Sequence, residues 1–229
     1  MFTHKKHIFF DLDHTLWDFD ANATHALTLI YQSADWQASG LDLSLFIEKF
    51  SEENKKLWTK LELEQISHED LRATRFQLAL GLLDVEIDTE ESLRLNGLFL
   101  ELLPEQNKLI EGCIAILESL KPRYELHILS NGYFDVQCKK IQSGGIAHYF
   151  KHIITNDIAA SRKPDLGIFT YAQNKTSAKA EESLMIGDSL IADVQGAKNA
   201  GWDAIHFSPK AESEEHLTIS KLEELLQYL

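Results

Sequence analysis

The chain has 229 residues, of which 44% are hydrophobic and 25% are charged, and its formal net charge at pH 7 is -14. This length allows one domain with an insertion or two small domains, and the apolar content is sufficient for a sizeable core. The acidic balance argues against a nucleic-acid polymer or an anionic membrane surface as a partner. A small anionic ligand remains compatible with it, because a divalent cation can reverse the local charge.

The cysteine content and the start of the chain point to the cytoplasm. Cys113 and Cys138 are too few for a disulfide framework, so we expect both to be reduced. No apolar run approaches the ~20 residues that a membrane-spanning helix requires. The basic start, residues 1–7, is followed by only three apolar residues before Asp11, which is unlike a signal peptide.

The first predicted strand, residues 8–10, ends in two aspartates, Asp11 and Asp13. A buried strand has no solvent for carboxylates, so we expect both at its carboxyl end, where open parallel sheets bind ligands. Side-chain alternation directs them to the same side. Two converging carboxylates repel unless a cation or a shared proton relieves them, which favours a catalytic site. The alternative is that they serve as helix caps or turn residues.

Between residues 17 and 104 the apolar residues have helical spacing. We expect helices over 21–34 and 43–63, a third that opens at Ser67, and a fourth that ends before Pro104. Ser67 is a predicted N-cap because Asp70 follows three residues later. The apolar face predicted for the third helix consists of Leu71, Leu78 and Leu82. This interval is predicted to be a helical bundle inserted after the first strand.

From residue 109 onward, predicted helices and strands alternate. Strands are expected over 126–129, 152–155, 184–186 and 204–207, and helices over 109–120, 133–143, 168–174 and 191–200. The acidic segment 211–229, with Glu212, Glu214 and Glu215 on a solvated surface, is expected to end in an amphipathic helix. Strands that alternate with helices predict an α/β fold with a parallel five-stranded sheet covered on both faces.

Polar residues recur where the predicted strands end. They are Ser130, Asn131 and Gly132 after the second strand, Lys163 after the third, Asp188 after the fourth, and Asp193 five residues later. In a parallel sheet these ends lie at one edge, so the groups can converge. Carboxylates suit Mg²⁺, and a lysine, a serine hydroxyl and backbone N–H groups suit phosphate oxygens. Singly, Asp188 is equally compatible with a helix N-cap and Lys163 with an exposed loop.

These motifs together resemble the haloacid dehalogenase superfamily of Asp-nucleophile phosphatases. Residues 11–15 match the first motif, Asp-x-Asp-x-Thr, Ser130 the second, Lys163-Pro164 the third, and Gly187-Asp188-Ser189 with Asp193 the fourth. The resemblance implies a Rossmann-like core, residues 1–16 and 105–229, and a helical cap, residues 17–104. Phe9–Asp13 and Leu16–Phe19 look most like the pyrimidine 5′-nucleotidase-like members. His14 stands where glycine is commonest in the first motif.

The resemblance also implies the roles of the acidic residues. Asp11 would attack phosphorus and form an aspartyl-phosphate, with Lys163 favouring its ionised form. Asp13 would protonate the leaving oxygen and then accept a proton from the hydrolytic water. Asp11, Asp188 and the backbone carbonyl of Asp13 would bind Mg²⁺. Asp193 would act indirectly, by holding Lys163 or a metal-bound water.

The remaining candidates concern phosphate and the rest of the substrate. The resemblance implies that Thr15 and Ser130 donate hydrogen bonds to phosphate or orient the loop. A cleft that stacks a base or gates water is a hypothesis for six residues: Trp17, Phe19, Trp58, Arg72, Arg75 and Tyr133. Arg75 is the preferred substrate-binding candidate among them. The alternative is that the aromatic residues are core and the arginines are solvated.

The leading functional hypothesis is a Mg²⁺-dependent phosphomonoester hydrolase that acts on a small phosphorylated metabolite, with a nucleoside 5′-monophosphate as the narrowest form. A sugar phosphomutase of the same fold and a non-catalytic binding module remain open as alternatives. Carbon–halogen hydrolysis is less supported, because dehalogenases lack the acid at the position of Asp13 and need no metal. The sequence leaves the oligomeric state undetermined.

Overall fold

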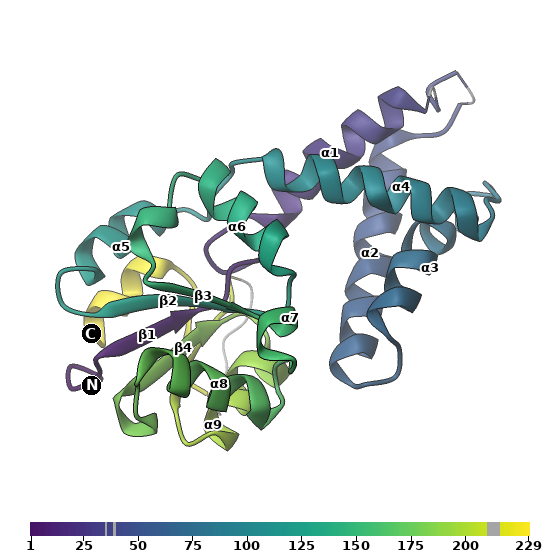
Figure 1. Cartoon of the computed structure of the whole chain (residues 1–229). Helices are drawn as coiled ribbons and strands as arrows, with labels where there is room; N and C mark the ends of the chain where they lie inside the picture. Colours follow the sequence, from purple (N-terminus) through teal and green to yellow (C-terminus); the bar gives the residue numbers. More distant parts are fainter. Residues whose placement is uncertain (35, 39, 210–215) are drawn as a thin grey trace. The chain divides into compact units, whose positions relative to one another are not determined.

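The computed structural model describes residues 1–34, 36–38, 40–209 and 216–229. The chain forms two compact units. Met1–Phe19 together with Asn107–Leu229 form an α/β core, and Asp20–Gln106 form an inserted helical cap (Figure 1).

The core contains a parallel sheet, as predicted, with six strands in the order β3-β2-β1-β4-β5-β6. The strands are β1 His7–Phe10, β2 Glu125–Ser130, β3 His152–Thr155, β4 Ser183–Gly187, β5 Asp203–Phe207 and β6 Thr218–Ile219. Strands β1 and β4 are buried along their whole length, which explains the unbroken apolar runs 8–10 and 184–186 within them.

The sixth strand corrects the expected five, and it lies within the segment 211–229, which was predicted to end in an amphipathic helix. β6 is only two residues long and pairs with His206 and Phe207 of β5. It is followed by a 3-10 helix, Leu222–Gln227, whose Leu222 and Leu225 are buried. The predicted surface residues Glu212, Glu214 and Glu215 lie outside the described residues.

Strand β1 lies in the middle of the sheet, and this position creates the site. Phe10 pairs with Ile128 of β2 on one side and with Ile186 of β4 on the other. The chain passes outward from β1 to β2 and β3, and then returns to β4 on the opposite side of β1. At such a reversal the carboxyl ends of neighbouring strands leave a crevice for a ligand. Asp11, Ser130 and Asp188 therefore come from three adjacent strand ends.

Helices cover both faces of the sheet, with α5 and α6 on one side and α8 and α9 on the other (Figure 1). The core helices are α5 Cys113–Leu120, α6 Phe134–Ser143, α7 Asn156–Ala159, α8 Leu166–Thr176 and α9 Gly196–Asn199. A π-helical segment, Leu190–Gln195, precedes α9, and short 3-10 helices span Leu103–Glu105, Ala147–Tyr149 and Ala180–Glu182. No helix in the described ranges is both long and apolar enough to cross a membrane.

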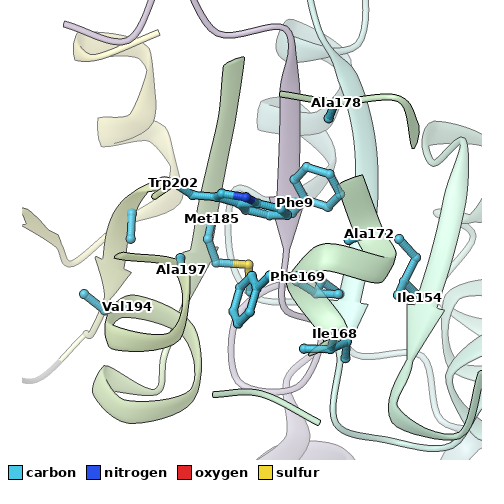
Figure 2. Packing of buried hydrophobic residues seen from close by; sticks show 12 residues of the cluster. Phe9, Ile154, Ile168, Phe169, Ala172, Ala178, Met185, Val194, Ala197 and Trp202 are labelled. Carbon is cyan, nitrogen blue, oxygen red and sulfur yellow. The ribbon is translucent and has the colours of Figure 1, made fainter. Parts of the chain in front are cut away.

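Phe9 of β1 packs against two aromatic rings within a largely aliphatic cluster (Figure 2). The ring of Phe9 lies 4.4 Å from that of Trp202, and Phe169 of α8 meets Trp202 edge-on at 5.2 Å. Met185 of β4 fills the space beside them. Offset and edge-on aromatic contacts add stabilisation beyond the burial of area. This packing fixes the strand that immediately precedes Asp11.

The cap consists of four helices: α1 Phe19–Ser33, α2 Leu43–Glu62, α3 His68–Gly81 and α4 Thr89–Leu102. The predicted cap of α3 is confirmed, because the Ser67 hydroxyl accepts from the Asp70 N–H at 3.0 Å and the Asp70 carboxylate accepts from the Ser67 N–H at 2.9 Å. The predicted apolar face of α3 was wrong for two of its three residues, because Leu71 is buried but Leu78 and Leu82 are exposed. Helix α3 packs against both α2 and α4, so its buried face is Leu71, Arg75, Phe76, Ala79 and Leu80.

The two chain segments that lead into and out of the cap are paired with each other. Trp17 forms an antiparallel bridge with Leu109, and the Asp18 N–H donates to the Lys108 carbonyl at 3.0 Å. Trp17 is fully buried. The core unit thus includes Trp17 and also Phe19, the first residue of α1, although the sequence placed both in the cap.

A row of histidines crosses the sheet near the start of the strands. The ring of His127 lies between Phe9 and His152, with centroids 4.7 Å and 5.4 Å away, and its Nε2 is 3.2 Å from His7 Nδ1. Burial, aided by His7 and His152, lowers the pKa of His127 to about 3. Burial also lowers the pKa of His7 and of His152. All three rings are neutral near pH 7.

This row predicts acid sensitivity of the fold. The unfolded chain takes up protons below the ordinary histidine pKa of about 6.5, whereas folded His127 does not, so the free energy of unfolding falls as the pH decreases toward about 3. When the pH is lowered from about 7.5 to about 5, the free energy of unfolding of His127→Gln should fall by about 2 kcal/mol less than that of wild type. Urea denaturation at both pH values measures this difference. The exposed His148 supplies the control: His148→Gln should keep the wild-type pH dependence. Equal losses in all three proteins would contradict the prediction.

Candidate active site

The loop after β1 presents Asp11 at the sheet edge. The Asp11 N–H donates to the Ile186 carbonyl at 2.9 Å, which continues the sheet pairing. The Leu12 carbonyl then accepts from the N–H groups of Leu16 and Trp17 at 3.0 Å and 2.8 Å, so the chain turns at once. His14 has φ 59°. This left-handed conformation explains why glycine suits the position.

Lys163 is the centre of the site. Its ammonium is buried and donates to Asp11 Oδ1 at 2.6 Å, Asp193 Oδ1 at 2.6 Å and the Leu129 carbonyl at 2.7 Å. These contacts use all three ammonium protons. Burial alone would lower the pKa of Lys163, but the charges of Asp11 and Asp193 outweigh it and raise the pKa, so the group stays charged.

Asp193 is held in place by the backbone after β4. Its Oδ2 accepts from the Ser189 N–H at 3.0 Å, and its other oxygen binds Lys163. A Cβ atom on Gly187 would lie 2.2 Å from Asp193 Oδ2, so this close approach requires glycine. Asp193 thus contacts Lys163 directly, and holding Lys163 is one of the two roles that the resemblance implied for it.

Two of the residues predicted to hold phosphate, Ser130 and Asn131, already make hydrogen bonds to other residues of the core. The Asn131 side chain donates to the Lys163 carbonyl at 2.9 Å and accepts from the Lys163 N–H at 2.7 Å, so it fixes the Lys163 loop. The Ser130 hydroxyl accepts from the Gly132 N–H at 3.1 Å. The Thr15 hydroxyl is buried and has no hydrogen-bond partner in the described part of the chain.

Three carboxylates converge beside Lys163. Asp11, Asp188 and Asp193 each place one oxygen within 4.8 Å of the others. Burial, and then repulsion from Asp193 and Asp13, raise the pKa of Asp11 to about 7 despite the opposing charge of Lys163. Burial and the charges of Asp11 and Asp193 also raise the pKa of Asp188 well above its ordinary value. Three carboxylates thus share one ammonium.

This charge imbalance fits a divalent cation. Two negative charges are left unpaired when Asp11, Asp188 and Asp193 are ionised beside Lys163, and oxygen donors are those that Mg²⁺ prefers. Both Asp193 oxygens are already bonded, to Lys163 and to Ser189. Asp11 and Asp188 are therefore the side chains best suited to hold the ion.

The side chain of Asp13 is bound from helix α6. Lys140 Nζ donates to its two oxygens at 2.6 Å and 2.8 Å, and Gln137 Nε2 donates to Oδ2 at 3.0 Å. Burial would raise the pKa of Asp13, but the charge and hydrogen bonds of Lys140, with the Gln137 hydrogen bond, lower it overall. Sequence reasoning missed Lys140 and Gln137. The available signal was their spacing, which places both on the face of α6 that buries Ile141.

The six predicted cleft residues divide between the two units. Trp17, Phe19 and Tyr133 belong to the core, and Trp58, Arg72 and Arg75 belong to the cap. The rings of Trp17 and Phe19 lie 4.7 Å and 5.7 Å from Lys140 Nζ. The Lys140 ammonium therefore lies against these two rings.

Arg75 is buried inside the cap. Its guanidinium carbon lies 4.6 Å from the ring centre of Phe99 and 5.8 Å from that of Phe50, and Nη1 donates to Asn54 Oδ1 at 3.5 Å. Its Nε has no partner, and no carboxylate of the described residues pairs with it. Burial, and then the charge of Arg72, lower the pKa of Arg75 to about 9.

The order of the motifs and their convergence agree with a comparison against protein families. The family of haloacid dehalogenase-like hydrolases matches residues 5–201. The chain belongs to this family. The hydrolase is thus an enzyme whose family was predicted from residues 11–15, Ser130, Lys163 and Asp188.

Individual relatives cover nearly the whole hydrolase. Pyrimidine 5′-nucleotidase PynA of Streptococcus pneumoniae is 33% identical over 206 residues, which are 89% of this chain and 84% of that protein. Pyrimidine 5′-nucleotidase YjjG of Escherichia coli is 26% identical over 228 residues, which are 97% of this chain and 96% of that protein. The crystal structure of the HAD-hydrolase YfnB from Bacillus subtilis, bound to magnesium, has a TM-score of 0.88 and 29% identity, and covers 98% of both chains.

The carboxylate excess predicts how Asp188→Asn changes thermal unfolding. In EDTA the variant should unfold a few degrees above wild type. Folding forces Asp188 either to stay ionised near Asp11 and Asp193 or to take up a proton, and asparagine avoids both costs. Millimolar Mg²⁺ should raise the unfolding temperature of wild type, by about 2–4 °C per kcal/mol of binding free energy, and that of the variant much less. Exposed Glu111 provides the control, and Glu111→Gln should respond as wild type does. An equal Mg²⁺ response in Asp188→Asn would contradict this metal assignment.

Proposed function

We propose that the hydrolase is a Mg²⁺-dependent phosphomonoesterase that acts on a small phosphorylated metabolite. The observation that carries this proposal is the convergence of Asp11, Asp188 and Asp193 on the buried Lys163, with Asp13 two residues beyond Asp11. Phosphoryl transfer is mostly positioning and charge neutralisation, and these groups supply both. The two free thiols, Cys113 and Cys138, support a reducing cytoplasmic location.

The first half-reaction uses Asp11 as the nucleophile. One Asp11 carboxylate oxygen bonds to phosphorus as the ester P–O bond breaks, giving an aspartyl-phosphate. Asp13 transfers a proton to the departing alcohol oxygen. Lys163 holds Asp11 Oδ1 and favours the ionised carboxylate.

The second half-reaction returns Asp11 to its starting state. A water attacks phosphorus, the bond from phosphorus to Asp11 breaks, and Asp13 takes up the water proton. The Thr15 hydroxyl, which has no hydrogen-bond partner among the described residues, is suited to hold a phosphate oxygen. When bound, Mg²⁺ would neutralise the carboxylate excess and the charge of the phosphoryl oxygens.

The narrower substrate class is a nucleoside 5′-monophosphate. The similarity to two pyrimidine 5′-nucleotidases along most of the chain supports it, and the magnesium in the YfnB structure supports the choice of ion. Arg75 supports it from the cap, because a buried guanidinium without a carboxylate is costly unless a ligand completes its hydrogen bonds. Carbonyl oxygens of a base would suit the N–H groups of the Arg75 guanidinium.

Phosphate release tests the reaction. With p-nitrophenyl phosphate and a panel of nucleotides and sugar phosphates, wild type should release phosphate only when Mg²⁺ is present. Asp11→Asn should lower kcat by at least about 10⁴-fold while the protein stays folded by circular dichroism. A folded Asp11→Asn variant with the wild-type rate would overturn the mechanism. Activity that depends on an added sugar bisphosphate, with little net phosphate released, would indicate a mutase instead.

Substitution of Arg75 tests the substrate class. Arg75→Met should raise KM for pyrimidine 5′-monophosphates by about 10-fold to 100-fold, the effect of a lost hydrogen bond to a charged group. It should leave the kcat/KM for p-nitrophenyl phosphate nearly unchanged, because that ester carries no base. Arg94 is the matched control, since it lies on α4, is largely exposed and pairs with Glu91. Equal losses for both kinds of ester would count against base recognition by Arg75.

A further inference from the structure

Lys140 is a buried lysine that none of the four motifs contains. It lies on α6, its side chain is 4% exposed, and its ammonium contacts both oxygens of Asp13 at 2.6 Å and 2.8 Å. A lysine is rarely buried without a specific partner. Here the partner is the residue to which the proposed mechanism gives both proton transfers.

Gln137 reinforces the same contact from one turn earlier on α6. Its Nε2 donates to Asp13 Oδ2 at 3.0 Å and to the Ser130 hydroxyl at 2.6 Å. Gln137 is fully buried. One helix therefore supplies donors to both oxygens of Asp13, and these donors fix the rotation of the carboxyl group about its Cβ–Cγ bond.

Aromatic rings fix the Lys140 ammonium in turn. Nζ lies 4.7 Å from the ring centre of Trp17 and 5.7 Å from that of Phe19. The Trp17 backbone is tied to the same loop, because its carbonyl accepts from the His14 N–H at 3.0 Å. A cation between a carboxylate and ring faces, away from solvent, is held in one geometry.

We propose that Lys140, assisted by Gln137, is a positioning residue for proton transfer by Asp13. This inference rests on the proposed function and deepens it. Lys140 keeps its own proton throughout. When Asp13 carries the proton that it took up from water in the preceding turnover, Lys140 holds one of its oxygens, and the other oxygen passes the proton to the leaving oxygen as the ester P–O bond breaks. In the second half-reaction the same contact keeps the carboxylate oriented toward the attacking water, whose proton it accepts.

The dependence on the leaving group separates this role from general support of the fold. The hydroxyl group of a sugar is a weak acid, so its oxygen needs a proton as it departs from phosphorus. p-Nitrophenolate is a stable anion and departs without one. If the loss of Lys140 displaces the Asp13 carboxyl group, the cleavage of alkyl esters should therefore slow more than the cleavage of the nitrophenyl ester. The ratio kcat/KM reports this step, because it covers events up to formation of the aspartyl-phosphate.

The experiment compares Lys140→Met with wild type on two substrates, in the presence of Mg²⁺. The substrates are p-nitrophenyl phosphate and the alkyl phosphomonoester that wild type hydrolyses fastest. Lys140→Met should lower kcat/KM for the alkyl ester by about 100-fold, and for the nitrophenyl ester by less than about 10-fold. Lys140→Arg should restore part of the loss on the alkyl ester, because it keeps the cation. Gln137→Met should also lower kcat/KM more for the alkyl ester than for the nitrophenyl ester, but by a smaller factor than Lys140→Met does.

Further readouts test the connection to Asp13. In an Asp13→Asn background, Lys140→Met should produce little additional loss, since the residue it positions is already disabled. Lys140→Met should also show a burst of p-nitrophenolate, about one equivalent per active site, because slower water attack lets the aspartyl-phosphate accumulate. Neighbouring Lys139 is exposed on the same helix, so Lys139→Met is the matched control and should keep both wild-type values.

Equal losses on both esters in folded Lys140→Met would overturn the inference and leave a structural role. Unchanged kcat/KM on both esters would overturn it as well. Failure of the proposed function looks different, because wild type itself would then release no phosphate from either ester. Full additivity of Lys140→Met with Asp13→Asn would also count against the inference.

Discussion

The buried ammonium of Lys163 is the interaction on which the rest of the site depends. It binds a carboxylate after β1, a carboxylate from the π-helical segment after β4, and a carbonyl of β2. A charge in this environment is tolerated only when every proton has a partner, so the three neighbouring strand ends must keep one arrangement. The central position of β1 makes this possible, because its neighbours on either side are β2 and β4.

The sequence predicted those parts of the site that a buried strand cannot contain. Asp11, Ser130 and Asp188 interrupt apolar runs, so their position at strand ends follows from desolvation alone. Lys140 could not be found this way, because a lysine on a helix is normally exposed and only the position of Asp13 makes it buried. Helical spacing likewise defined a face on α3 but not which face packs, and Leu78 proved exposed where Arg75 is buried. Strand β6 has two residues, too few for any periodic signal.

Each unit buries charges that lower its stability: an excess of negative charge in the core and one positive charge in the cap. In the core, Asp11, Asp188 and Asp193 share one lysine. In the cap, Arg75 lies among aromatic rings with its Nε unpaired. Such groups lower the stability of the ligand-free protein, and sites that bind a partner are where such losses are tolerated. The proposed metal ion would complete the arrangement in the core.

The backbone pairing of Trp17 with Leu109 has an evolutionary consequence. The core backbone closes on itself where the insertion begins and ends, so the loop that carries Asp11 and Asp13 is tied to the core on both sides of the insertion. The inserted helices can then change in sequence while this closure is kept. An ancestral catalyst could acquire a new substrate range by exchanging the residues between those two positions, with its nucleophile left intact.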